Sequence, residues 1–364
     1  MWSRIPVVKF VFAFTRTLES LNPQTLFKTL DNKKEHELIV SVSPHVKGEA
    51  SVSRIMWTVN LALLPSFLMS VYFFGPRALW ILSLCIGSAV LFEYIYKKTL
   101  KMKHTTGDGS AFLTGLLLGM NLPPSIPFYI PIVGSFVAII ITKQLFGGLG
   151  YNIFNPALIG RAFLLISWPK AMTVWSEPTA LFIKMDAKTT ATPLGILKEE
   201  GIGKLIEIFG DKAHLYMQLL TGNRAGSLGE TSAIALLFGA AFLIYKGYIT
   251  WHIPASFLGT VAALAWVFGG KGALFTGDPV IHLLSGGLIL GAFFMATDYV
   301  TCPSIRKGQI IFGIGCGAIT MLIRLKGGFP EGVMFAILLM NCFAPLIDRG
   351  VKTDQFGAVK VQKK

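Results

Sequence analysis

Apolar runs about as long as a lipid bilayer is thick recur along most of this chain, and they constrain its fold more than any other feature. A spanning helix needs roughly 20 consecutive apolar residues, because the hydrocarbon core of a bilayer is about 30 Å thick. Only 14% of the 364 residues are charged, whereas a typical soluble domain carries about 25%. We therefore predict an all-α polytopic membrane protein.

The apolar runs form about ten segments, arranged as two groups around a long polar stretch. We expect these segments at residues 53–74, 78–97, 109–121, 125–143, 152–168, 230–248, 252–270, 278–297, 308–325 and 329–347. Some are short or interrupted by Gly and Pro, as where segment 109–121 ends at Leu122-Pro123-Pro124. Irregular backbone at membrane depth is tolerated only around a cavity, so we expect these segments to line a binding site.

The two groups share short motifs at matching places. T-G-D precedes an apolar segment at 106–108 and again at 276–278, and a Gly pair precedes the last segment of each group at 147–148 and 327–328. Because each group holds an odd number of segments, the two copies must face opposite sides of the membrane. The pattern predicts two inverted five-helix repeats with a site where they meet. Chance recurrence of glycine pairs before helices is the alternative.

Lys and Arg gather at the two termini and in alternate short loops. The positive-inside rule then places both termini in the cytoplasm and the long polar stretch on the outer face. The expected organisation is a cytoplasmic tail with a candidate interfacial helix (1–52), a first five-helix repeat (53–168), an outer loop (169–229), a second repeat (230–348) and a basic cytoplasmic tail (349–364).

The net charge of +14 follows this membrane pattern, so we do not predict nucleic-acid binding. The four cysteines are scattered without a C-x-x-C pair, and we therefore predict no metal or iron–sulfur site formed by this chain alone. They are Cys85, Cys302, Cys316 and Cys342.

Several long motifs resemble the RnfD/NqrB family, over about residues 41–350. They are S-P-H-V (43–46), D-G-S-A-F-L-T-G-L-L-L-G (108–119), L-P-P-S-I-P (122–127), K-Q-L-F-G-G-L-G-Y-N-I-F-N-P-A (143–157), G-S-L-G-E-T-S (226–232), M-A-T-D (295–298) and N-C-F-A-P-L-I-D (341–348). The sequence of residues 108–127 is more similar to RnfD than to NqrB.

The resemblance implies a subunit of the Rnf complex in the bacterial cytoplasmic (inner) membrane. Such a complex couples electron transfer between ferredoxin and NAD to Na⁺ or H⁺ transport. Because this chain lacks a nucleotide-binding fingerprint and cluster cysteines, iron–sulfur and NADH-binding subunits and a second covalent-flavin subunit are the implied partners. Three alternatives remain: an NqrB-like subunit of a sodium-pumping NADH:quinone oxidoreductase, a small-solute channel of similar fold, and an assembly subunit that has lost its flavin.

The family also implies a cofactor for the stretch D-A-K-T-T-A-T at 186–192. Its members carry FMN linked through the phosphate to the last Thr of D-x-x-[S/T]-G-A-T. Asp186, Thr189, Ala191 and Thr192 match, which makes Thr192 the acceptor, while Thr190 replaces the motif's Gly. A flavin transferase must reach this hydroxyl, so we expect Thr192 to be exposed and flexible. A solvated Thr-rich turn is the alternative.

Other polar residues are candidates for holding flavin. The stretch 222–232 has backbone N–H groups and a helix N-terminus suited to an anion or a carbonyl, although it is equally compatible with a plain helix cap. Its candidates are Gly222, Gly226, Ser227, Glu230 and Thr231. The resemblance implies a second, non-covalent riboflavin near Asn152 and Asn155, for which hydrogen bonding at a helix end is the alternative. We expect Arg161 to pair with an acid or a flavin oxygen.

Acidic residues in apolar segments are candidates for ion translocation. Glu93, Asp298 and Asp348 lie near the predicted inner ends of segments, and the resemblance links acids at such positions to cation uptake. Pairing with nearby Lys or Arg is the alternative for each. Asp108 and Asp278 are weaker candidates, because each opens a segment and so favours a helix cap.

Overall fold

The computed structural model describes residues 51–102, 105–178, 189–230, 232–270 and 274–351. The predicted tails lie almost entirely outside these ranges, as do two candidate site residues, Asp186 and Thr231. All described residues belong to the same contact unit, Ala50–Lys364.

The first half of the fold, residues 52–167, consists of helices at the predicted segments. They are α3 (Val52–Phe74), α4 (Pro76–Thr99), α5 (Ser110–Met120), α6 (Tyr129–Phe136), which continues as a π-helix η2 (Val137–Gln144), and α7 (Pro156–Ser167), with a short 3-10 turn η1 (Thr106–Asp108) before α5. Local signals set their ends. Ser51 caps α3 by accepting from the Arg54 N–H, and Asn155 caps α7 directly before Pro156.

The connecting segment, between α7 and the second half of the fold, contains more helix and strand than the predicted outer loop (169–229). It contains α8 (Pro169–Thr173), a two-residue antiparallel ladder of β1 (Trp175–Ser176) with β2 (Thr189–Thr190), then α9 (Pro193–Glu199), α10 (Ile202–Phe209), α11 (Lys212–Thr221) and a 3-10 turn η3 (Leu228–Glu230). Leu205, Leu215 and Leu219 form a small core of their own with Ile281. The sequence shows the helical spacing of these apolar residues only weakly, because the helices are short.

The second half, residues 233–350, again follows the predicted segments. Its helices are α12 (Ala233–Tyr245), α13 (His252–Phe268), α14 (Pro279–Leu284), α15 (Leu288–Leu290), a π-helix η4 (Gly291–Met295), α16 (Arg306–Lys326) and α17 (Val333–Gly350). The predicted segment 278–297 is a broken helix. Gly286 and Gly287 interrupt it with φ of 70° and 64°, a left-handed conformation that glycine adopts without strain.

Among the described residues, four helices, α3, α4, α16 and α17, are long and apolar enough to cross a membrane. The shorter apolar helices are α5, α6 with η2, α7, α12 and α13. Large apolar side chains remain exposed on these elements, such as Trp80, Ile166 and Tyr245. An apolar surface of this extent suits lipid better than water. The chain is thus a multi-pass membrane protein.

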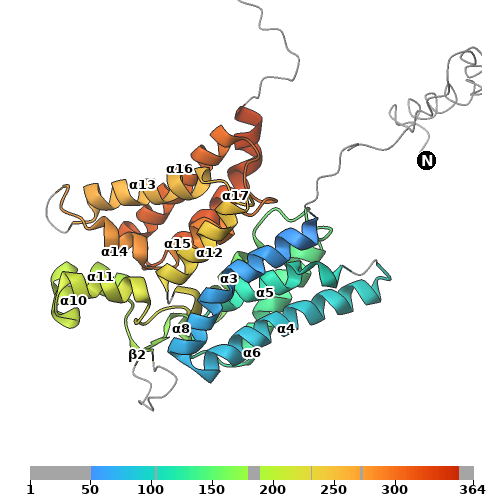
Figure 1. The fold of residues 1–364 in the computed structure, drawn as a ribbon, viewed down its shortest axis with the longest axis horizontal. Helices are drawn as coiled ribbons and strands as arrows, with labels where there is room; N and C mark the ends of the chain where they lie inside the picture. Colours follow the sequence, from blue (N-terminus) through green and yellow to red (C-terminus); the bar gives the residue numbers. More distant parts are fainter. Residues whose placement is uncertain (1–50, 103–104, 179–188, 231, 271–273, 352–364) are drawn as a thin grey trace, which may run out of the picture. The chain divides into compact units, whose positions relative to one another are not determined.

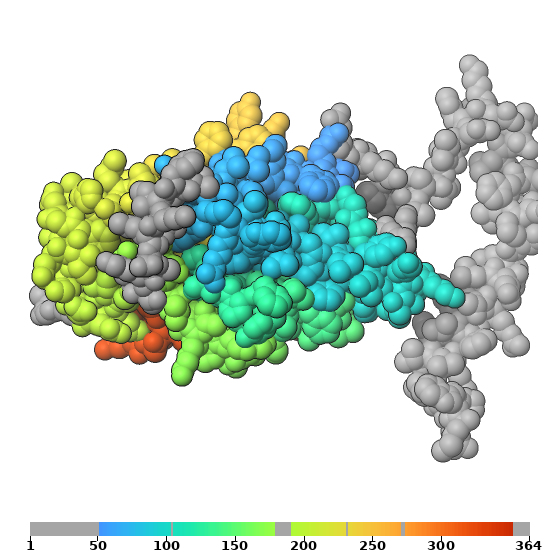
Figure 2. All heavy atoms as spheres, turned by 90° about the horizontal axis from the view of Figure 1, so that it is seen from below, coloured from blue at the N-terminus to red at the C-terminus, as the bar shows by residue number. Residues whose placement is uncertain are grey.

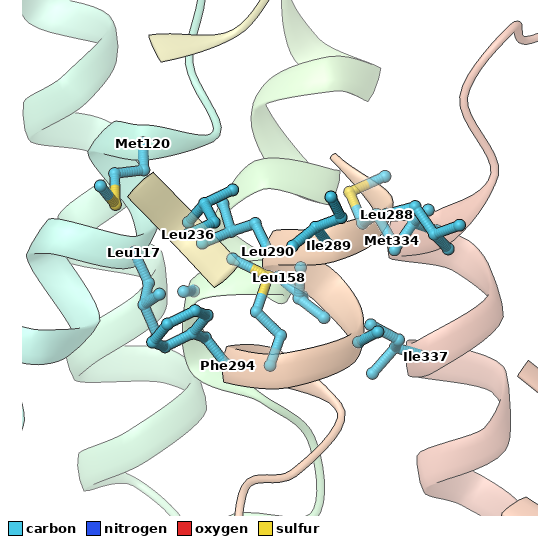
Figure 3. Close-up of a cluster of buried hydrophobic side chains, with 14 of the residues drawn as sticks. Leu117, Met120, Leu158, Leu236, Leu288, Ile289, Leu290, Phe294, Met334 and Ile337 are labelled. Atoms are coloured by element: carbon cyan, nitrogen blue, oxygen red, sulfur yellow. The ribbon is translucent and has the colours of Figure 1, made fainter. Parts of the chain in front are cut away.

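The two halves pack against each other through α3 with α12 and through α7 with α17. Figure 1 shows the first half in blue to green beside the second half in yellow to red. Figure 2 shows α3 and α4 on one face, with the yellow-green connecting segment at one end. Leucine, methionine and phenylalanine side chains from α5, α7, α12, α15, η4 and α17 fill the space between the halves (Figure 3).

Glycines allow the closest helix contacts, as they do in many membrane proteins. At Gly239 on α12, an added Cβ would lie 2.0 Å from the Ala62 carbonyl oxygen on α3. We expect Gly239→Ala to separate these helices and to lower the free energy of unfolding by about 1–3 kcal/mol, as overpacking does. Gly259→Ala is the matched control, because nothing lies within 4 Å of a Cβ at that helical glycine. Thermal unfolding in detergent checks this, and equal melting temperatures for the two variants would contradict the close contact.

Candidate functional site

Thr192 lies between β2 and α9 and caps that helix, with its Oγ1 accepting from the Gly195 N–H at 3.2 Å. The side chain is 6% exposed, whereas Ala191 before it is exposed. The β1–β2 ladder fixes the preceding backbone, with Thr190 opposite Trp175. The expectation of an exposed Thr192 is therefore wrong, because the side chain caps α9 in a buried position.

Thr192 lines a cavity of about 220 Å³, called here the Thr192 cavity. Its walls come from α7, α8, β1, α9, the break between α14 and α15, and the start of α17. Aromatic residues Trp175, Phe329 and Phe335 contribute apolar surface, and the charged lining residues are Arg161, Glu199 and Glu331. Aromatic walls with few polar groups are typical of sites for flat organic ligands.

An ion pair between the two halves forms one wall of this cavity. Arg161 on α7 bonds through Nη2 to Glu331 Oε2 at 2.5 Å, and through Nη1 to Asn121 Oδ1 at 2.9 Å. The prediction that Arg161 pairs with an acid is thus confirmed, and the partner lies just before α17. Arg161 Nε and Glu331 Oε1 are buried and have no hydrogen-bond partner among the described residues. Both residues line the Thr192 cavity.

Two further buried arginines bind the broken helix behind this cavity. Arg224 donates to Ser285 Oγ at 2.9 Å and to the Leu284 carbonyl at 2.6 Å. Arg324 donates to the His282 carbonyl at 2.6 Å and to the Ser285 carbonyl at 2.9 Å. Carbonyls at a helix end inside a membrane protein need such partners, so these arginines stabilise the break after α14.

Glu230, a predicted cofactor-binding residue, belongs to a charged cluster with Glu331 and the three arginines Arg161, Arg224 and Arg324. An added Cβ would lie 3.1 Å from Glu230 Oε2 at Gly226 and 3.1 Å from Oε1 at Gly287. These two glycines thus leave the space that the carboxylate fills. Burial lowers the pKa of the Arg224 guanidinium, while the charges of Glu230 and Glu331 raise it. Three arginines, Arg161, Arg224 and Arg324, face two glutamates here, so basic side chains outnumber acidic ones by one.

The other candidates in residues 222–232 have structural roles. Gly222 ends α11 with a φ of 98°, and Ser232 caps α12 by accepting from the Ala235 N–H. Ser227 is buried. The helix-cap interpretation therefore describes Gly222 and Ser232, whereas Glu230 belongs to the charged cluster.

The predicted asparagines lie in a different place, around a cavity of about 90 Å³, called here the Asn152 cavity. Asn155 caps α7, and its Nδ2 donates to the Met295 carbonyl at 3.3 Å, which joins the two halves. Asn152 Nδ2 donates to the Phe154 carbonyl at 3.1 Å, while its buried Oδ1 has no partner among the described residues. Asn155 is thus a helix-end residue, and Asn152 retains a free acceptor.

Glu93 is fully buried and bonded to two lysines. Lys143 Nζ lies 2.8 Å from Oε2, and Lys97 Nζ lies 3.2 Å from Oε1. Lys143 also donates to Ser110 Oγ at 2.6 Å, and both Lys143 and Ser110 line the Asn152 cavity. The predicted alternative of pairing with lysine is therefore observed for Glu93. The ion pair with Lys143 connects Glu93 to the Asn152 cavity.

The aspartates differ in their surroundings. Asp298 lines the Asn152 cavity and accepts from the Val300 N–H and the Thr301 hydroxyl. Asp108 accepts from the Ser110 N–H at 2.8 Å, and Asp348 accepts from the Ser304 N–H. Asp278 caps α14 and accepts from the Tyr216 hydroxyl; burial and this carboxylate raise the pKa of Tyr216 to about 12. Asp278 is thus a helix cap, as the alternative interpretation had it, whereas Asp108 precedes Gly109, the cap residue of α5, and accepts from the first N–H of that helix.

Sequence reasoning missed Arg224, Arg324, Glu331 and the pairing of Lys143 as site residues. Lys143 and Arg324 lie at the ends of the predicted segments 125–143 and 308–325, yet each is at most 3% exposed. A charge inside or beside an apolar segment was the signal that marked them.

Comparison with known proteins places these features in a family. The model of the NQR2, RnfD, RnfE family matches residues 39–357. The D subunit of the proton-translocating ferredoxin:NAD(+) oxidoreductase complex of Clostridium ljungdahlii is 55% identical over 324 residues, which cover 89% of this chain and 97% of that protein. The D subunit of the Na(+)-translocating ferredoxin:NAD(+) oxidoreductase complex of Acetobacterium woodii is 47% identical, over 90% of this chain and 98% of that protein.

Proposed function

This chain belongs to the NQR2, RnfD, RnfE family, and we propose that it is the RnfD-type subunit of an ion-translocating ferredoxin:NAD⁺ oxidoreductase complex. The observation that carries the proposal is the similarity to such subunits over nearly the whole of both chains. It favours ferredoxin and NAD over the NADH:quinone alternative. The complex lies in the bacterial inner membrane, with iron–sulfur, NADH-binding and second covalent-flavin subunits as partners.

Thr192 carries FMN through a phosphoester in this proposal. The described residues fit such a group: the Thr192 hydroxyl lines a cavity with aromatic walls, and two buried polar atoms there lack partners, Arg161 Nε and Glu331 Oε1. When bound, FMN accepts and passes on electrons. Arg161 holds a flavin oxygen by donating from Nε. The excess positive charge of the arginine cluster favours negative charge arriving beside it.

Attachment of FMN requires a change at Thr192. The hydroxyl is buried and already accepts a hydrogen bond from the Gly195 N–H, so a transferase cannot reach it in this packing. Residues 189–192 therefore receive the group before they pack, or after displacement from β1. Thr190 pairs with Trp175 in an ordinary ladder, so its place at the motif's Gly position needs no left-handed backbone here.

In this proposal a non-covalent riboflavin binds at the Asn152 cavity, which must widen to admit it, because its volume is about 90 Å³ and pockets for such ligands are typically about 300–1,000 Å³. The free Asn152 Oδ1 accepts from a ring N–H, and the Lys143 ammonium, which lines the same cavity, faces a ring carbonyl. Asn155 positions this wall by joining α7 to Met295 rather than by binding the ring itself.

Ion transport is assigned to the polar groups at the Asn152 cavity. Glu93, through Lys143, and Asp298 both connect to it, whereas Asp108, Asp278 and Asp348 do not line it. We therefore rank Glu93 and Asp298 above the other three acids.

The membrane topology proposed is ten segments as two inverted repeats, with cytoplasmic termini and an outer loop at 169–229. Matching contacts support it. The helix α4 packs on α5 as α13 packs on α14, and Asp108 accepts from the N–H two residues on, as Asp278 does. The Asn152 cavity is lined by residues at the predicted inner ends of segments, such as Met56 and Tyr248. The Thr192 cavity is lined by residues at predicted outer ends.

Cysteine labelling tests this topology. In a Cys342→Ser background, we expect Glu200→Cys to react with a membrane-impermeant maleimide on intact cells, because the connecting segment faces outward. Lys246→Cys, after α12, is expected to react only after the cells are opened. Both side chains are exposed, so burial does not explain a difference. Labelling of both positions from the same side would contradict the topology.

A further inference from the structure

A cavity of about 650 Å³ lies between α9, α13, α14 and α16, and it shares only Pro330 with the Thr192 cavity. Leu264 and Phe268 from α13 form one apolar wall, and Ala318 and Leu322 from α16 form another. Leu322 is 65% exposed and Phe268 is 54% exposed, so the walls continue onto the outer surface of the helices.

The charged lining residues of this cavity are all basic. Lys198, Arg324 and Lys326 line it, and its described lining includes no Asp or Glu. Lys198 Nζ donates to the Gly327 and Phe329 carbonyls, so its charge is solvated without being neutralised there. Arg324 Nε and His282 Nδ1 are buried and have no hydrogen-bond partner among the described residues. Glu331, next to Pro330, is bonded to Arg161 instead.

The cavity lies where lipid headgroups meet a membrane helix. Lys326 is the last residue of α16, which is long enough to cross a membrane, and Phe268 is the last residue of α13. From Lys326 back to Ala318, the wall extends about 12 Å toward the membrane interior at roughly 1.5 Å per residue. A basic end with an apolar groove beneath it matches the two parts of an anionic lipid.

We propose that this cavity binds an anionic phospholipid, with its phosphate at Lys198, Arg324 and Lys326 and one acyl chain between α13 and α16. A free phosphate leaves the apolar walls unused, and a zwitterionic lipid brings a second cation to a cavity whose charged lining residues are all basic. The two cavities share Pro330 and helix α9, but Ala318 and Lys326 line only this one, so variants at these residues test the lipid separately from the flavin at Thr192.

Photocrosslinking in the intact complex tests the proposal. The probes are phosphatidylglycerol and phosphatidylcholine with a diazirine in one acyl chain, in nanodiscs, and labelled residues are mapped by mass spectrometry. We expect phosphatidylglycerol to label α16 around Ala318 and Leu322 in preference to phosphatidylcholine. The double variant Lys198→Gln with Lys326→Gln is expected to reduce this labelling roughly 25-fold. Each basic residue near a lipid surface raises the affinity for anionic lipid about fivefold. Lys170→Gln, an exposed lysine that does not line the cavity, is the matched control.

A second variant tests the apolar groove separately from the basic residues. Ala318→Phe fills the groove while leaving every lysine in place, and we expect it to lower the phosphatidylglycerol label to the phosphatidylcholine level. Lys326→Gln alone covers the case in which Lys198→Gln disturbs the carbonyls it binds. Equal labelling by the two lipids, labelling that the lysine variants leave unchanged, or competition by millimolar inorganic phosphate would each overturn the proposal.

Discussion

Thr192→Val is expected to remove covalently bound FMN completely and to reduce ferredoxin:NAD⁺ electron transfer by the assembled complex to background. Valine matches threonine in shape but has no hydroxyl to form the phosphoester. The variant also loses the cap of α9, which costs only about 1 kcal/mol, so the protein is expected to fold and assemble. In-gel flavin fluorescence after denaturation measures the first effect, and turnover of the purified complex measures the second.

Two neighbouring substitutions control this experiment. Thr190→Val changes a hydroxyl two residues away in β2 and should leave the flavin in place. Thr192→Ser keeps a hydroxyl at the attachment position and should retain at least part of the flavin. A coloured, active Thr192→Val complex would remove the assignment of Thr192 while leaving the family membership intact.

Glu93→Gln is expected to have the second largest effect, because it leaves Lys143 buried and without its carboxylate. Lys143 is 1% exposed and Glu93 is 0% exposed, so neither charge reaches water. Removing one partner of a buried ion pair costs about 3–5 kcal/mol. We expect a fall of that size in the free energy of unfolding, measured by thermal or chaotrope-induced unfolding in detergent, and little assembled complex.

The double variant Glu93→Gln with Lys143→Met distinguishes a structural role from a transport role. Removing both charges leaves only the Lys97 ammonium without its carboxylate, and Lys97 is 8% exposed and still donates to the Thr105 hydroxyl, so we expect most of the stability to return. If Glu93 carries ions, the restored protein still fails to build an ion gradient in proteoliposomes during electron transfer. A stable double variant that transports ions like the wild type would show that the pair only supports the fold.

Much of the fold follows from sequence, because apolar length is a strong constraint. The structure places helical elements at each predicted segment, from α3 to α17. The breaks were harder to predict. Gly286 and Gly287 interrupt segment 278–297 in the structure, and only the neighbouring Arg224 and Arg324 explain how the freed carbonyls are satisfied. Those partners are distant in sequence and could not be predicted from it.

The site illustrates the same limit. The motif around Thr192 predicts a modified hydroxyl but not its burial, which depends on pairing between β1 and β2. Arg161 predicts an acidic partner but does not identify Glu331, 170 positions away. Asn152 and Asn155 look alike in sequence, yet one caps a helix and the other retains a free oxygen. Local pattern identifies candidate residues, whereas long-range packing decides which atoms remain available.

Fragmentation mass spectrometry of the tryptic peptide at residues 189–198, from protein produced together with its flavin transferase, tests the attachment of FMN directly. We predict an added mass of FMN less one water, located on Thr192 rather than on Thr189 or Thr190. An unmodified peptide, or a modification on either of the other two threonines, would contradict it.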